Sequence, residues 1–128
     1  MSKGIWKLKV KKDFSAAHQL RNYGGKCENM HGHNFGVEVE VKGNRLDSRV
    51  EILMDFKELK RDLSEVLETL DHKHLNSTEF FEHQNPSSEN IARYIYKEMQ
   101  KRVETEHVKM VYASVSEKDS SVASYSEE

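Results

Sequence analysis

Apolar and polar residues alternate along four stretches of the chain, as expected for strands with one buried face. Residues 5–12 alternate apolar residues with lysines and predict the first strand. Residues 31–42 predict the second, and two stretches near the C-terminus, 111–117 and 122–125, predict a third and a short fourth. The inward face of the second strand would carry His31, His33, Phe35, Val37, Val39 and Val41.

Two segments between the second and third strands have helical spacing. The first begins at Asp55, a predicted N-cap with Glu58 in the capping-box position, and carries Phe56, Leu59, Leu63, Val66, Leu67 and Leu70. The second begins around Pro86 and carries Ile91, Ile95, Met99 and Val103. The element order predicts one α+β domain over residues 1–128, with a four-stranded antiparallel sheet and two helices on one face.

Charge, apolar content and cysteine content restrict the possible partners and the cellular compartment of the protein. Charged residues make up 33% of the 128 residues, the net charge is −2, and lysines are interleaved with glutamates. No basic stripe results, so we expect no nucleic-acid partner; no apolar run is long enough for a membrane-spanning helix. A lone cysteine and an N-terminus without a signal-peptide pattern predict a cytoplasmic protein with a reduced thiol. The two open edges of the predicted sheet favour a homo-oligomer.

Three histidines form the strongest chemical signal. His31 and His33 are two residues apart on the apolar face of a strand, so both imidazoles project to the same side. An unpaired imidazole is costly to bury there. With His18 alongside, they would form a three-histidine site, which suits Zn²⁺ and leaves a coordination position open for substrate. We therefore predict that His18, His31 and His33 bind zinc.

Cys27 lies four residues before this pair, in a glycine-rich loop and beside Lys26. A neighbouring cation lowers the pKa of a thiol, which favours a catalytic thiolate. Two alternatives stay open. Cys27 could be the fourth ligand of a purely structural Cys/His3 zinc module, or an inert small residue.

Two carboxylates extend the candidate chemistry. Asp71 precedes His72 at the end of the first predicted helix, where the pair could act as an acid–base couple or His72 could simply complement the helix dipole. Glu117 continues the apolar face of the third strand, so its carboxylate needs a partner. A ligand with adjacent N–H donors would supply one, and an arginine would serve equally well.

Five motifs, taken in order, resemble the 6-pyruvoyltetrahydropterin synthase family, and within it the bacterial 6-carboxytetrahydropterin synthases of queuosine biosynthesis. The resemblance extends over nearly the whole chain. The motifs are Phe14-Ser-Ala-Ala-His18, Cys27-x-x-x-His31-Gly-His33, Leu70-Asp71-His72-x-x-Leu75-Asn76, Pro86-Ser-Ser-Glu89-Asn90 and Ser116-Glu117.

The resemblance implies a tunnelling fold in which trimers form a barrel and two trimers stack as a hexamer. It assigns zinc to the three histidines and makes Cys27 the catalytic base. Asp71 and His72 become acid–base partners contributed by a neighbouring subunit. Glu117 becomes the anchor for a pterin ring, with Ser87 and Ser88 as further candidates for substrate binding.

The implied reaction converts 7,8-dihydroneopterin triphosphate to 6-carboxytetrahydropterin, acetaldehyde and triphosphate. A 6-pyruvoyl product would need nearly the same residues. Family members that cleave the substrate side chain, giving 6-hydroxymethyldihydropterin, use a glutamate in this region in place of the cysteine. Glu28 next to Cys27 makes that activity a second alternative. Lys26, Arg21 and Lys73 are candidates for the triphosphate.

Overall fold

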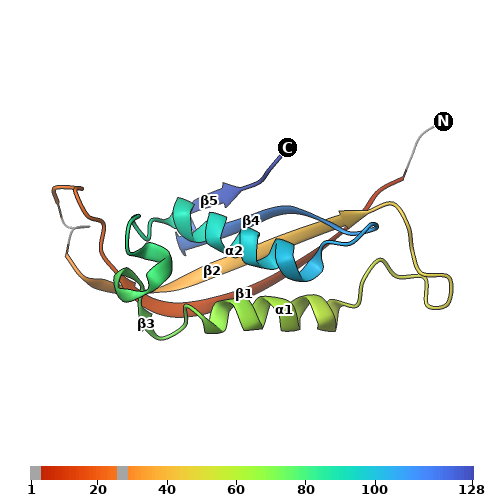
Figure 1. The fold of residues 1–128 in the computed structure, drawn as a ribbon, viewed down its shortest axis with the longest axis horizontal. Helices are drawn as coiled ribbons and strands as arrows, with labels where there is room; N and C mark the ends of the chain where they lie inside the picture. Colours follow the sequence, from red (N-terminus) through yellow and green to blue (C-terminus); the bar gives the residue numbers. More distant parts are fainter. Residues whose placement is uncertain (1–3, 26–28) are drawn as a thin grey trace.

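The computed structural model describes residues 4–25 and 29–128, which form a curved sheet with two helices packed along it (Figure 1). The sheet has five strands in the order β3-β1-β2-β4-β5. The strands are β1 (Trp6–His18), β2 (His31–Gly43), β3 (Lys73–His74), β4 (Lys109–Lys118) and β5 (Ser121–Tyr125). The α-helices are α1 (Phe56–Glu68) and α2 (Ser88–Val103), and two short 3-10 helices, η2 (Leu75–Ser77) and η3 (Glu79–Phe81), follow β3. The predicted α+β class and both predicted helices are therefore confirmed.

The sheet is mixed, so the predicted set of four antiparallel strands was wrong in one respect. A fifth strand, β3, runs parallel to β1 and pairs Ala16 with Lys73 and Ala17 with His74. A strand of two residues is too short to show any alternation, and tertiary contacts define it instead. The backbone N–H of His72 donates to the carbonyl of Ser15 at 2.5 Å, which brings the chain alongside β1.

The first strand also runs further than its pattern predicted. Alternation breaks at the exposed Lys12, but buried side chains resume at Phe14 and Ala16, and the strand ends only at His18. Its antiparallel register with β2 places Phe14 opposite Phe35 and His18 opposite His31. The two phenylalanine rings stack with their centroids 4.9 Å apart. This register brings the first histidine to the other two.

One core fills the space between the sheet and the helices. The alternating apolar residues of β1, β2 and β4 point into it, and the apolar faces of both helices close over them. Asp55 caps α1 by accepting a hydrogen bond from the backbone N–H of Lys57 at 2.8 Å. The fully buried helix residues are Leu59, Leu63, Val66, Ile91, Ala92, Ile95 and Met99. This core holds the ends of β1, β2 and β4 in fixed relative positions.

Among the described residues, no helix combines the length and the apolar character needed to cross a lipid bilayer.

Candidate metal centre

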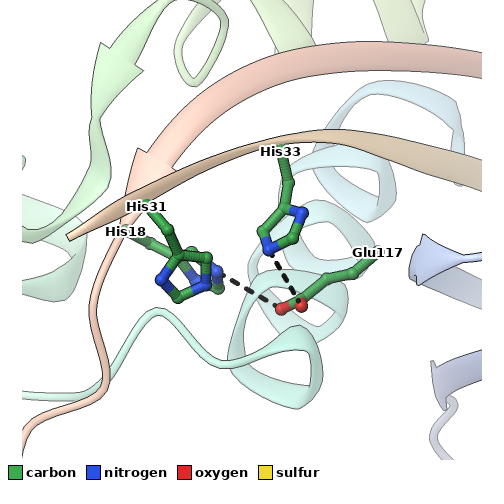
Figure 2. A group of neighbouring side chains, drawn as sticks. All are labelled: His18, His31, His33 and Glu117. Carbon is green, nitrogen blue, oxygen red and sulfur yellow. Dashed lines mark ion pairs between the residues drawn. The ribbon is translucent and has the colours of Figure 1, made fainter. Parts of the chain in front are cut away.

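Three imidazoles and one carboxylate converge at one end of the sheet (Figure 2). His18 is the last residue of β1, His31 and His33 begin β2, and Glu117 lies near the end of β4. One potential ligand atom from each of the four lies within 4.8 Å of the others. The three histidines predicted from spacing are brought together. Glu117, which the pattern predicted to need a partner and the family resemblance predicted to anchor a pterin, joins them.

His18 is the most buried member, with 1% of its surface exposed. Its Nδ1 donates to the carbonyl of Pro86 at 2.7 Å, so a neutral ring carries its proton there and leaves Nε2 free to act as a ligand. That buried Nε2 makes no hydrogen bond within the described part of the chain, although Oε1 of Glu117 lies 3.3 Å away. Burial lowers the pKa of His18, outweighing the Pro86 hydrogen bond, and so favours the neutral form that a metal requires.

The other two histidines are half-buried and face the same point. Nδ1 of His31 donates to the carbonyl of Asn29 at 2.8 Å, which leaves its Nε2 available. Nε2 of His33 lies 3.5 Å from Oε2 of Glu117. Three imidazoles with free nitrogens and one nearby carboxylate are a donor set that suits zinc. The buried nitrogen of His18 without a hydrogen bond supports this fit, since a metal would satisfy it.

A pocket of about 480 Å³ opens beside this cluster, and Glu117 belongs to both. Ser87 and Ser88, at the start of α2, line the same pocket. Ser88 Oγ donates to Oε1 of Glu117 at 3.4 Å, whereas Ser87 Oγ caps the helix by accepting from the N–H of Asn90 at 3.1 Å. The structure thus brings together three residues that the family resemblance associates with substrate.

Asp71 and His72 form a pair that is not part of the cluster and lies just before β3, at the edge of β1 opposite β2. Oδ2 of Asp71 lies 2.9 Å from Nδ1 of His72, and Oδ1 accepts from the N–H of Ser15 at 2.9 Å. The Ser15 hydrogen bond, helped by His72, holds the pKa of the Asp71 carboxyl below its usual range. His72 has a positive φ of 59° and an 81% exposed side chain. The pair is therefore fixed at its carboxylate and open to solvent at its imidazole.

Cys27, Glu28 and Lys26 lie outside the described residues. Arg21 already has protein partners, because its guanidinium donates to the carbonyls of Gln84, Asn76 and Phe81 at 2.9–3.3 Å. Sequence reasoning missed that structural role. It also missed the carbonyl of Pro86, which no side-chain pattern could reveal.

Comparison with known proteins identifies the family. A model described as 6-pyruvoyl tetrahydropterin synthase matches residues 7–128. The chain belongs to this family. It is 40% identical over 90 residues to a protein of Archaeoglobus fulgidus named putative 6-carboxy-5,6,7,8-tetrahydropterin synthase, covering 70% of this chain and 72% of that one. It is 36% identical over 90 residues to the dihydroneopterin monophosphate aldolase of Pyrococcus furiosus, covering 70% and 71%.

The fold agrees with this assignment. The 6-pyruvoyl tetrahydropterin synthase of Caenorhabditis elegans superposes over the whole of both chains with a TM-score of 0.86 at 26% identity. Family membership and the His/His/His/Glu cluster together define a pterin lyase with a metal site. The proteins it resembles carry the names of different activities, so family membership does not determine the product of the reaction.

Proposed function

We propose that this protein is a zinc-dependent lyase that converts 7,8-dihydroneopterin triphosphate to 6-carboxytetrahydropterin, acetaldehyde and triphosphate, as a cytoplasmic step of queuosine biosynthesis. The observation that carries the proposal is the cluster of His18, His31 and His33 beside a pocket that shares Glu117 with it. The name of the Archaeoglobus fulgidus relative supports the 6-carboxy product in particular.

In this proposal the three histidines hold the zinc ion, which would act as a Lewis acid toward the oxygens of the substrate side chain. Glu117 accepts hydrogen bonds from adjacent N–H groups of the pterin ring. Two features favour this role over that of a fourth ligand. Ser88 and the pocket lie next to the carboxylate, and a catalytic zinc site keeps one position open.

Proton transfer falls to residues around the substrate. Cys27 acts as the base in its thiolate form, and the Asp71–His72 pair supplies and accepts protons. The Asp71 carboxylate orients the imidazole through Nδ1 and leaves Nε2 for the substrate. Following the family resemblance, we infer that the pair serves the cluster of a neighbouring subunit; in its own chain it is not part of the metal cluster.

The free sheet edges support assembly of several copies. In the described chain β3 pairs only with Ala16 and Ala17, so most of β1 has an open edge, and β5 forms the other edge of the sheet. We expect light scattering to show a hexamer, or at least a trimer. Co-expressing differently tagged Cys27→Ala and His72→Ala chains should restore activity in mixed oligomers, because some sites then combine an intact residue of each kind. A monomer with full turnover would contradict this arrangement.

The reaction itself is tested by incubating the purified protein with dihydroneopterin triphosphate and identifying the products by mass spectrometry. Formation of 6-carboxytetrahydropterin with acetaldehyde supports the proposal. Accumulation of a 6-pyruvoyl product would instead identify a 6-pyruvoyltetrahydropterin synthase. If the protein still holds zinc but the pterin substrate is recovered unchanged, the structural zinc module is favoured.

A side-chain-cleaving activity is a second candidate because of Glu28 and the aldolase relative. Removal of a side-chain hydroxyl proton by this carboxylate would favour cleavage of the C–C bond over loss of triphosphate. We expect a minor 6-hydroxymethyldihydropterin product in the wild type. It should persist in Cys27→Ala and disappear in Glu28→Ala.

Glu28→Gln, which keeps the size of the side chain and removes the base, is the matched control and should behave like Glu28→Ala. If neither the wild type nor Cys27→Ala forms that product, Glu28 takes no part in catalysis.

A further inference from the structure

The segment that follows His18 is held by side-chain amides instead of a neighbouring strand. The Asn76 amide accepts from the N–H of Gln19 at 2.9 Å and donates to its carbonyl at 3.0 Å. The Asn85 amide does the same for Arg21, with both distances 2.9 Å. Each amide therefore satisfies both main-chain polar groups of one residue, as a paired strand would.

Asn85 also directly precedes Pro86, whose main-chain carbonyl contacts the proposed metal ligand His18. The carbonyl of the following residue, Pro86, accepts the hydrogen bond from Nδ1 of His18. The main-chain carbonyl of Asn85 accepts from Nδ2 of Asn90, on the first turn of α2, at 2.9 Å. Residue 85 is thus fixed on one side to Arg21 and on the other to the helix. Because Pro86 has no N–H, it cannot donate a main-chain hydrogen bond of its own, so the hydrogen bonds of Asn85 help to hold this part of the chain.

We propose that Asn85 is a positioning residue for zinc binding. Its amide holds the Pro86 carbonyl against Nδ1 of His18, which keeps the proton on that nitrogen and directs Nε2 toward the other ligands. The inference rests on the proposed metal site. Hydrogen-bond partners of metal-binding histidines fix ring orientation and tautomer, and their loss typically weakens metal binding about 10–100-fold.

The test compares zinc dissociation constants, measured by competition with a chromogenic chelator, in the wild type, Asn85→Ala and Asn85→Asp. We expect roughly 10-fold or greater weakening in Asn85→Ala, in line with such partners. Asn85→Asp keeps the acceptor for the Arg21 N–H but loses the donor, so it should give a smaller loss. If Asn85→Ala does not fold, Asn85→Asp still tests the inference.

Thr69→Val is the matched control. It removes two hydrogen bonds of the Thr69 hydroxyl, to the carbonyl of Val66 and with the hydroxyl of Tyr94, at the end of α1. We expect it to lower the melting temperature and leave the zinc affinity unchanged. A purely structural role for Asn85 would give this same result.

Nitrogen NMR of the His18 ring provides a second readout. In the zinc-free wild type the neutral ring should carry its proton on Nδ1, and zinc-free Asn85→Ala should lose that preference. Wild-type zinc affinity in both Asn85 variants would overturn this inference alone. Failure of the wild type itself to bind zinc would overturn the metal site, and the inference with it.

Discussion

Replacing His31 with alanine is expected to remove bound zinc almost completely. His31 contributes one of three imidazoles, and its Nδ1 is already held by the Asn29 carbonyl, so Nε2 is the nitrogen that can bind the ion. Only two of the three proposed ligands remain in the variant, because Glu117 is assigned to the substrate, and two imidazoles hold zinc more weakly than three. Elemental analysis of the purified protein after dialysis against zinc-free buffer measures the loss. Lyase activity should fall with it.

His107→Ala is the control for this experiment. His107 is 43% exposed and contacts Arg45 at 3.2 Å, outside the metal cluster. This variant should retain the zinc content and the activity of the wild type. Full zinc occupancy in His31→Ala would refute the three-histidine site, whatever its activity.

The sequence predicted those parts of the site that depend on periodicity within one element. The two-residue spacing of His31 and His33 on an apolar strand face was enough to place both rings on the same side, because the side-chain period of a strand is fixed. The two helices could be predicted in the same way, because their apolar faces repeat over several turns. The structure confirms both helices, and it confirms that the two rings lie together.

Features that depend on contacts between elements could not be predicted in this way. The alternation of β1 breaks at the exposed Lys12, so neither the length of the strand nor the pairing of His18 with His31 followed from the pattern. β3 has no pattern because it contains only two residues. For Glu117 the sequence showed that a partner was needed, and only the fold showed that His18 and His33 lie beside it.

The main-chain partners of the site were the features that the sequence could least predict. The contact of the Pro86 carbonyl with His18 and the amide pairs of Asn76 and Asn85 link residues 57–68 positions apart. Single side chains that bond to distant backbone groups have no repeat to detect. The same holds for Arg21, which its charge made a candidate for triphosphate binding and the structure assigns to three carbonyls.

Replacing Cys27 with alanine is expected to abolish the reaction while zinc stays bound. If the three histidines are all the ligands that the protein supplies to zinc, the thiol is not needed to hold the ion. Its loss then removes only the base. Loss of a general base lowers turnover by roughly 10²–10⁴-fold. Turnover with dihydroneopterin triphosphate, zinc content and melting temperature should be measured on the same preparation. The last two should match the wild type.

The structural zinc module predicts the opposite pattern for Cys27→Ala. A thiolate that closes a Cys/His3 site contributes binding energy, and binding energy at a structural site is folding energy. Zinc would then be lost and the protein destabilised, and X-ray absorption of the substrate-free wild type would show a zinc–sulfur bond near 2.3 Å. Cys27→Ser is the matched control, since it keeps the size of the side chain and removes the acidic thiol. Retained zinc with lost turnover in both variants would establish Cys27 as a catalytic residue, and a zinc–sulfur bond in the free protein would refute that role.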